Sequence, residues 1–247
     1  MKGFIMKRLF ETVERNINQL VDKNVAWSRC ICDEDMQNAK SGTVNLHLTH
    51  SRKIPHNWLP ASLKGSKLLC LAGAGGQQAP LLAMAGADVT VLDLSEKMLE
   101  QDRIMAERYH LQLDLIHGNM CDMHFFPDNL FDIIINPSSL MYIPDVSIVY
   151  KECYRILKKG GIFILSAPAP VNYLCEFVQE GQYYKACNRM PYKSYEHENQ
   201  GDWIEFGHTM EDYLGGLLLS GFIIKGYFEE QLEDITDLSF VIKAIKP

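Results

Sequence analysis

The sequence predicts an α/β protein built on a doubly wound, mostly parallel sheet. Three observations favour this class. From residue 66 onward, strand-like and helix-like segments alternate, which is typical of a parallel sheet covered by helices on both faces. Residues 68–71 have the apolar composition of a buried strand and enter a glycine-rich turn at residues 72–76. A second, β-branched strand at residues 89–92 precedes Asp93, at the edge where such sheets bind ligands.

The remaining elements follow from their periodicity. Helical signals lie in residues 77–85, 96–109 and 147–157. Strand signals lie in residues 113–117, 131–136 and 162–167. After a polar and aromatic stretch without clear periodicity, the chain predicts a helix and two strands at residues 209–219, 222–228 and 238–245.

The N-terminal segment differs from the rest. Residues 1–20 alternate charged and apolar positions, which indicates an amphipathic helix rather than a signal peptide. We therefore expect a helical cap segment over residues 1–65 and a ligand-binding domain over residues 66–247, with a substrate lid at residues 168–206. No segment reaches the roughly 18 apolar residues of a membrane span.

Composition narrows the function classes. The chain has 247 residues and a net charge of −7 without a basic block, which makes nucleic acid a poor candidate partner. Its seven cysteines are irregularly spaced, and Cys30 and Cys32 lack the two-residue spacer of a metal or redox pair. We expect no metal site, reduced thiols and a cytoplasmic location. The oligomeric state is not predicted.

The glycine-rich turn and Asp93 together suit a nucleoside. Glycines let a ligand lie against the backbone, and a carboxylate about 20 residues further on can accept hydrogen bonds from ribose hydroxyls. From residue 66 to 246 the sequence also resembles, in order and spacing, the class I S-adenosylmethionine-dependent methyltransferases of the small-molecule type, which have a seven-stranded Rossmann-like sheet with an antiparallel last strand. The matching motifs are residues 72–76, Asp93, residues 118–120, Asn136, residues 142–145, residues 152–161 and residues 217–222.

The resemblance implies a cofactor site for S-adenosylmethionine, with S-adenosylhomocysteine as the product. Asp93 is expected at the ribose, Leu94 and Met120 beside the adenine, and Tyr142 at the sulfonium. Asn119 either contacts the adenine amino group or only closes a turn. The implied cofactor-binding residues are Ala72, Gly73, Ala74, Gly75, Gln78, Asp93, Leu94, Asn119, Met120, Cys121, Asn136, Ser138 and Tyr142.

The glycine loop departs from the family pattern in two places. Cys70 stands where an acidic residue often positions the amino end of the cofactor, and Ala72 replaces the first glycine. Because an alanine methyl disfavours left-handed backbone, we expect the loop to differ there or Ala72 to occupy a tolerant place. Gln77 and Gln78 either replace the missing contact with their amides or merely begin a helix.

Methyl transfer is an in-line displacement that depends mostly on positioning, so no catalytic residue is compulsory. His208, Glu205 and His124 are candidates for proton removal, each with a structural role as the alternative, and Tyr142 could act at the sulfonium. Asn136 opens a segment that resembles the Asn-Pro-Pro-aromatic motif of amino-group methyltransferases, but two serines break the match.

Three functions stay open at this point. The favoured one is methyl transfer to a small molecule held under the aromatic stretch at residues 168–206. Cys70 and Ala72 also fit a cofactor-binding regulator or a degenerate methyltransferase without turnover. A nicotinamide-dependent oxidoreductase is less favoured because Gln78 stands where the third glycine of a dinucleotide fingerprint belongs.

Overall fold

A computed structural model describes residues 2–194, 203–231 and 238–247, with side chains from residue 6 onward. The central sheet contains β1 (Lys67–Leu71), β2 (Asp88–Asp93), β3 (Leu113–His117), β4 (Phe131–Asn136), β5 (Leu157–Pro168), β10 (Ile223–Gln231) and β11 (Leu238–Ile245). The order across the sheet is β10-β11-β5-β4-β1-β2-β3. Strands β1 to β5 are parallel, whereas β11 runs antiparallel to both of its neighbours. The predicted fold class is confirmed.

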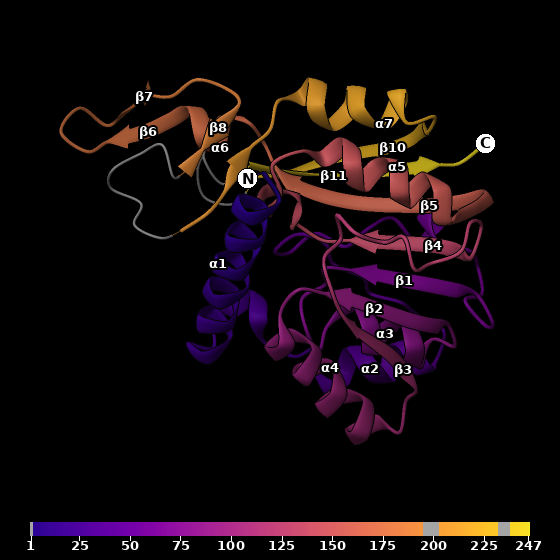
Figure 1. Ribbon diagram of the computed structural model, residues 1–247. Coiled ribbons are helices and arrows are strands. Elements are labelled where there is room, and N and C mark those ends of the chain that lie inside the picture. The colour runs from indigo at the N-terminus through magenta and orange to yellow at the C-terminus, as the bar shows by residue number, and fades with distance from the viewer. Residues whose placement is uncertain (1, 195–202, 232–237) are drawn as a thin grey trace.

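Helices cover both faces of this sheet and one of its edges (Figure 1). The described helices are α1 (Lys2–Asp22), α2 (Asp33–Lys40), α3 (Gln78–Met84), α4 (Glu96–Tyr109), α5 (Val146–Ile156), α6 (Val171–Leu174) and α7 (Gly216–Leu219). Short turns are η1 (Ala26–Ser28), η2 (His56–Trp58), η3 (Leu140–Tyr142) and the π-helical η5 (Glu211–Gly215). Figure 1 shows α1 standing beside the ends at which the parallel strands finish.

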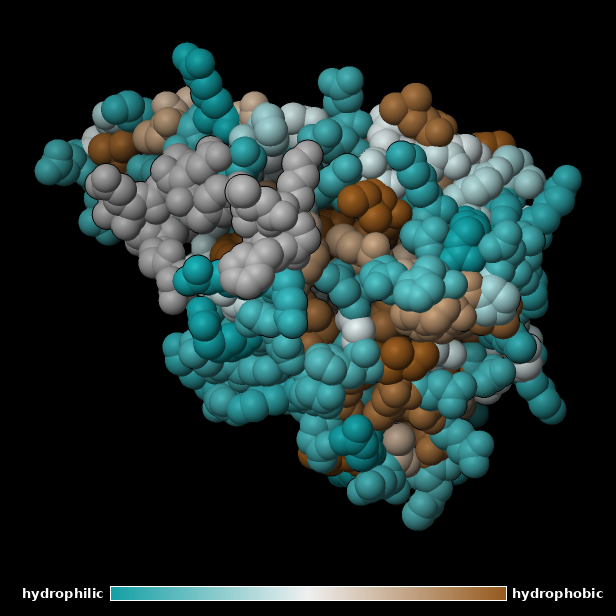
Figure 2. All heavy atoms as spheres, in the orientation of Figure 1, coloured by the Kyte–Doolittle hydropathy of each residue, from teal (hydrophilic) through white to brown (hydrophobic). Residues whose placement is uncertain are grey.

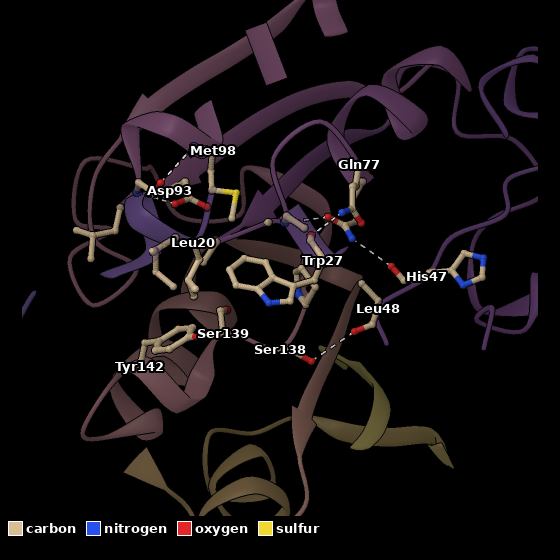
Figure 3. A pocket seen from close by; sticks show the side chains of 18 of the residues that line it. Leu20, Trp27, His47, Leu48, Gln77, Asp93, Met98, Ser138, Ser139 and Tyr142 are labelled. Carbon is tan, nitrogen blue, oxygen red and sulfur yellow. Dashed lines mark hydrogen bonds between the residues drawn. The ribbon is translucent and has the colours of Figure 1, made fainter. Parts of the chain in front are cut away.

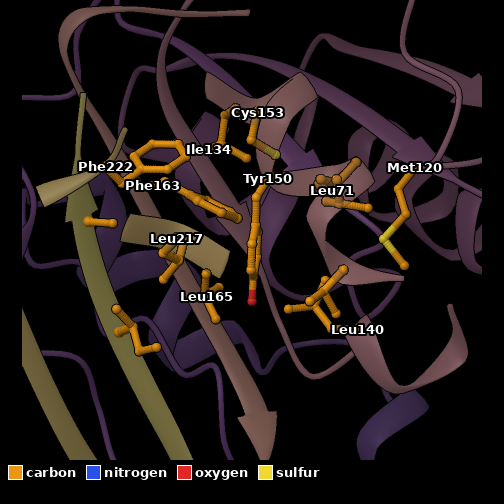
Figure 4. Packing of buried hydrophobic residues seen from close by; sticks show 14 of the residues in the cluster. Leu71, Met120, Ile134, Leu140, Tyr150, Cys153, Phe163, Leu165, Leu217 and Phe222 are labelled. Carbon is orange, nitrogen blue, oxygen red and sulfur yellow. The ribbon is translucent and has the colours of Figure 1, made fainter. Parts of the chain in front are cut away.

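The core is divided by the sheet into two layers. In β1, Leu69 and Leu71 belong to one cluster, with α5 and α7, while Leu68 and Cys70 belong to the other, with α2 and α3. Alternate residues of a strand point to opposite faces, so a strand covered on both faces must be apolar throughout. Figure 4 shows the first cluster around Tyr150 of α5, whose ring meets Phe163 edge-on at 6.2 Å.

The predicted elements agree with the observed ones within a few residues, except around the predicted lid. The stretch predicted to lack periodicity contains α6 and two short hairpins, and residues 195–202 lie outside the described part. Strand β6 (Cys175–Val178) pairs with β7 (Tyr183–Ala186), and β8 (Tyr192–Lys193) pairs with β9 (Phe206–Gly207). Strands this short are stabilised by partners elsewhere in the chain, and local periodicity does not reveal them.

No helix in the described part of the chain is both long and apolar enough to cross a membrane. Figure 2 shows the outer face of α1 as largely hydrophilic, which agrees with an amphipathic helix whose apolar face is turned inward.

Candidate functional site

A cavity of about 770 Å³ lies at the carboxyl ends of the parallel strands. Its wall includes Ala72 after β1, Asp93 at the end of β2 and Ser138 after β4 (Figure 3). In an open parallel sheet these strand ends meet at one edge, where the chain turns away and leaves a crevice. The fold thus brings together side chains that are far apart in the sequence.

The amphipathic helix α1 supplies one wall of this cavity. Its lining residues are Phe10, Val13, Glu14, Ile17 and Leu20, spaced by three or four positions as one helical face. An apolar wall excludes water, which strengthens the polar contacts that a bound ligand makes with the strand ends.

The glycine loop is fastened to α4 by two hydrogen bonds. The Gly75 N–H donates to Met98 Sδ at 3.2 Å, and the Gly76 N–H donates to Asp102 Oδ1 at 2.7 Å. A Cβ placed on Gly75 would lie 2.3 Å from the backbone oxygen of Met98, so the close approach of α4 requires glycine there. Gly75 is therefore a packing position, and it does not line the cavity.

Ala72 adopts a left-handed conformation with φ of 49°. The expectation that an alanine at this position would keep out of left-handed backbone was wrong. Its N–H donates to the carbonyl of Leu92 at 2.8 Å, which ties the exit of β1 to the end of β2. The left-handed φ turns the chain out of the strand directly after this bond, at a backbone strain of about 1–2 kcal/mol.

Asp93 is a buried carboxyl group on the cavity wall, with 7% of its surface exposed. Its Oδ1 accepts the Ser95 N–H at 2.7 Å. The pKa of Asp93 is raised to about 8. Burial is the main cause and the nearby Asp102 adds to it, while the hydrogen bonds from Ser95 and Leu94 oppose the rise. A buried carboxylate of this kind gains strongly from hydroxyl donors, which a ribose would provide.

Two adjacent glutamines connect the glycine loop to the segment before β1. Gln78 Oε1 accepts the Ala74 N–H at 3.1 Å, and Gln78 Nε2 donates to the His47 carbonyl at 3.2 Å. Gln77 Nε2 donates to the carbonyls of Trp27 and Arg29 at 2.6 and 2.8 Å. The Trp27 ring points into the cavity in Figure 3. Both side-chain amides therefore hold the N-terminal segment against the loop.

Cys70, which replaces the family's acidic residue, is buried within the sheet and does not line the cavity. Burial raises the pKa of its thiol well above the usual range, so the group is neutral. A different acidic side chain, Asp35, lines the cavity, and its oxygens accept hydrogen bonds from Asn45 Nδ2 at 2.9 Å and Cys32 Sγ at 3.4 Å.

Among the residues that end or follow β2, β3 and β4, some line the cavity and others only support it. Leu94, Asn119 and Met120 line the cavity, and Asn119 Oδ1 accepts the Cys121 N–H at 2.8 Å, which forms the turn given as the alternative for Asn119. Asn136 is fully buried outside the lining, and its Nδ2 donates to the Leu71 carbonyl and to Ser139 Oγ at 2.7 Å each. The other predicted cofactor residues on the wall are Ala72, Gly73, Ala74, Gln78, Asp93, Ser138 and Tyr142, whereas Cys121 is not among them.

The structure places some of the candidates for acid–base chemistry on the cavity wall and others away from it. His208 does not line the cavity: its buried Nε2 lies 3.1 Å from the Leu140 carbonyl and 3.0 Å from that of Ile143, and so braces η3. The His124 side chain is 80% exposed and pairs with Asp122. Tyr142 and Glu205 line the cavity.

Sequence reasoning missed Met98, Asp102 and the carboxylates Glu14 and Asp35. Met98 and Asp102 are four residues apart and occupy the buried face of α4. A carboxylate on the apolar face of an amphipathic helix was a usable signal for Asp102, because such a group needs a hydrogen-bond partner. The roles of Glu14 and Asp35 depend on how the N-terminal segment packs, for which no local pattern exists.

Comparisons with known proteins agree with this fold and site. Residues 69–165 match the family model described as a methyltransferase domain. A Bacillus subtilis protein named as an uncharacterized methyltransferase, YbaJ, is 39% identical over 222 residues, covering 85% of this chain and 86% of its own length. The demethylmenaquinone methyltransferase of Listeria welshimeri is 43% identical over 74 residues, which are 30% of this chain and 31% of that protein.

Among solved structures, an S-adenosylmethionine-dependent methyltransferase from Mesorhizobium loti superposes with a TM-score of 0.62 at 21% identity, covering 76% of this chain and 94% of that one. The doubly wound fold and the cavity at its strand ends define a class of ligand-binding α/β proteins. Within that class, the chain belongs to the S-adenosylmethionine-dependent methyltransferase family. It is a methyltransferase whose methyl donor is S-adenosylmethionine, and the nicotinamide alternative has no support.

Proposed function

We propose that this methyltransferase acts on a small-molecule acceptor by in-line displacement. The observation that carries the proposal is the cavity, which runs from Asp93 to Tyr142 and Glu205 and has a volume of about 770 Å³. Small-molecule sites typically enclose about 300–1,000 Å³ and have mostly apolar walls with a few fixed polar groups. Two relatives with shorter matches are named for their action on small molecules, demethylmenaquinone and a sterol.

The residues present fit the cofactor. Asp93 would accept hydrogen bonds from the ribose hydroxyls, and Leu94 and Met120 would contact the adenine. The backbone at residues 72–74, held by Gln78, would carry the amino-acid end, and the Tyr142 ring would face the sulfonium. The cofactor supplies an electrophilic methyl carbon, and the protein supplies alignment and exclusion of water.

Two segments outside the common sheet would choose the acceptor. Residues 1–65 contribute α1 and Trp27 to the wall, and residues 168–206 contribute Trp203 and Glu205. We propose that these act as cap and lid, because side chains on added segments can vary while the cofactor site stays constant. The cytoplasmic location expected from cysteine usage remains a prediction.

The first experiment measures melting temperature with S-adenosylmethionine, S-adenosylhomocysteine or NAD. A ligand at 100 times its dissociation constant adds about 2.7 kcal/mol to the stability of the folded state. We expect both adenosyl ligands, but not NAD, to raise the melting temperature. Asp93→Ala should remove the rise, and Asp88→Ala, at the exposed start of the same strand, should retain it.

A methyl-transfer assay against a panel of small molecules then tests the acceptor class. Turnover of any member that Asp93→Ala abolishes supports the proposal. Cofactor stabilisation without turnover across the panel would favour a binding protein without activity. Absence of stabilisation by either adenosyl ligand would overturn the assignment of the cavity.

A further inference from the structure

The lid side of the cavity presents one carboxyl group to the acceptor region. Glu205 lines the cavity together with Trp203, Met141 and Tyr142, next to the end of β4 where the methyl group is expected. It directly precedes β9, whose Phe206 pairs with Lys193 of β8. Glu205 therefore lies on an inserted segment but is attached to an ordered pair of strands.

The backbone around Glu205 is fixed by one buried serine. The Glu205 N–H donates to Ser194 Oγ at 2.8 Å, and that hydroxyl donates to the Trp203 carbonyl at 2.6 Å. The Ser194 N–H donates in turn to the Glu205 carbonyl at 2.9 Å. Ser194 has no exposed surface, so its side chain is already fixed by packing. Its hydrogen bonds therefore hold the backbone of Glu205 at the cavity wall with little further loss of conformational entropy.

Glu205 has no cationic partner in the described part of the chain. None of the recorded ion pairs there includes it, although Lys and Arg pair with carboxylates elsewhere on the surface. Burial raises the pKa of Glu205, and a hydrogen bond from Trp203 opposes that rise. A carboxylate desolvated without a counter-ion is costly, so a bound cation would stabilise it.

Two aromatic side chains, Tyr142 and Trp203, line the cavity together with this carboxyl group, and Tyr173 and Tyr192 lie outside the lining. The rings of Tyr142 and Trp203 meet edge-on at 6.2 Å, and those of Tyr173 and Tyr192 stack at 5.3 Å. Burial raises the pKa values of Tyr142, Tyr173 and Tyr192, and in each case the charge of Glu205 adds to the rise. Aromatic faces beside a carboxylate favour a positively charged group.

The whole cavity has an acidic wall. Its lining contains three other acidic side chains, Glu14, Asp35 and Glu205, besides Asp93, whose raised pKa favours the neutral form in the ligand-free protein. Arg29 is the single Lys or Arg among its described lining residues. Such a wall attracts cations and repels carboxylate or phosphate groups. An anionic acceptor is thus disfavoured.

From these observations we infer that the acceptor is a primary or secondary amine whose ammonium form is bound by Glu205 beside the aromatic rings of Tyr142 and Trp203. The inference rests on the proposed small-molecule function and names the acceptor class within it. It assigns Glu205 two roles, anchoring the ammonium group and removing its proton.

The chemical step balances with these groups. The ammonium group gives one proton to the Glu205 carboxylate, which leaves a neutral amine with a free lone pair. That lone pair forms the new N–C bond while the S–C bond breaks, and the electron pair of the broken bond stays on sulfur. The positive charge passes from the sulfonium to the methylated ammonium, and no further reactant is required.

The test uses three matched ligand series on the complex with S-adenosylhomocysteine, in which no turnover occurs. The series are phenethyl, hexyl and indolylethyl compounds, each tested as the amine, as the alcohol and as a carboxylate. In the carboxylate, the carboxyl carbon takes the place of the last carbon of the chain, so that the three ligands have the same length. We expect at least one amine to raise the melting temperature more than its alcohol, and the carboxylates to have no effect. Calorimetry should then give an amine affinity at least tenfold above that of the alcohol.

Glu205→Gln should remove this preference for the amine while leaving the S-adenosylhomocysteine affinity within about twofold. Glu205→Asp, which keeps the charge, should retain part of the preference. Glu176→Gln, at an exposed position of β6, should retain all of it. The preference in the wild-type protein stands as a test even if the Glu205 variants fail to fold.

The outcomes separate this inference from the proposed function. If Glu205→Gln weakens S-adenosylmethionine binding but not S-adenosylhomocysteine binding, Glu205 serves the sulfonium and the inference is overturned. Absence of any amine preference in all three series also overturns it. In both cases a response to S-adenosylhomocysteine leaves the proposed function standing, whereas loss of that response in wild type would overturn the proposed function itself.

Discussion

The Asp102 carboxylate on α4 accepts the backbone N–H of Gly76 at 2.7 Å. Helix α4 begins three residues after Asp93, so a single helix follows the Asp93 carboxyl group directly and holds the far end of the glycine loop. Ser95 reinforces the arrangement, because its Oγ caps the helix by accepting the Met98 N–H at 3.1 Å. The loop therefore has its shape before any ligand binds, which reduces the entropic cost of binding.

Asp102→Ala should lower the free energy of unfolding by about 1–3 kcal/mol, because the buried Gly76 N–H loses its acceptor. It should also weaken S-adenosylhomocysteine binding. Urea denaturation and calorimetry measure the two effects. Asp102→Asn is the matched control, since its amide oxygen can still accept the bond. An alanine variant as stable as the asparagine variant would show that the hydrogen bond contributes nothing.

Gln78→Ala should loosen the contact between the N-terminal segment and the glycine loop. The substitution leaves the Ala74 N–H and the His47 carbonyl without the amide that joins them, at a cost of about 1–3 kcal/mol in stability. We expect weaker binding of S-adenosylhomocysteine by calorimetry and faster proteolysis of residues 23–50. Gln37→Ala on the exposed face of α2 serves as control. Unchanged cofactor affinity in Gln78→Ala would refute its proposed role at the amino-acid end.

Ala72→Gly should leave stability unchanged or raise it by about 1 kcal/mol. Glycine removes the strain of a left-handed alanine, and the greater freedom of its unfolded chain offsets part of the gain. Ala72→Val should instead destabilise, since a β-branched residue tolerates that conformation poorly. Thermal unfolding of both variants decides the matter, and a glycine variant that is clearly less stable than wild type would count against a strained turn.

The stability of the ligand-free protein should fall as pH rises from about 4 to about 8. Burial raises the pKa of Asp93 from 3.8 to about 8, so in this range the unfolded chain has released a proton that the folded protein still holds. The free energy of unfolding then decreases by up to about 1.4 kcal/mol per pH unit. Asp93→Asn should show a shallower slope in urea denaturation. Parallel curves for the two proteins would contradict the raised pKa.

The fold class and half of the site follow from local patterns in the chain. Strand β1, the glycine turn and Asp93 are neighbours in sequence, and their apolar runs and turn residues identify them without knowledge of packing. The same holds for α4, which was predicted with the observed bounds from its periodicity and its Ser95 cap. Hydrophobic periodicity and the residue preferences of turns depend on a few adjacent residues, so they can be read directly from the sequence.

The conformation of Ala72 and the strand pairing in the segment between β5 and β9 depend on contacts with other parts of the chain. At Ala72 the chain leaves β1 through a left-handed turn, directly after the Ala72 N–H bonds to the carbonyl of Leu92, twenty positions away. The hairpins between β5 and β9 form by pairing short segments without a pattern of their own. The intrinsic secondary-structure preference of these residues is weak, and contacts with the surrounding structure override it.

The sequence by itself determined an alternating α/β sheet, a glycine turn and a carboxyl group at the end of the second strand, because each is encoded within a short stretch of chain. Only the tertiary structure decided that α1 closes one wall, that Asp102 holds Gly76 and that Glu205 faces the cavity from the lid side. Those relations join residues from 26 to more than 100 positions apart. They arise from the packing of whole helices and strands, which the periodicity of a short sequence segment does not indicate.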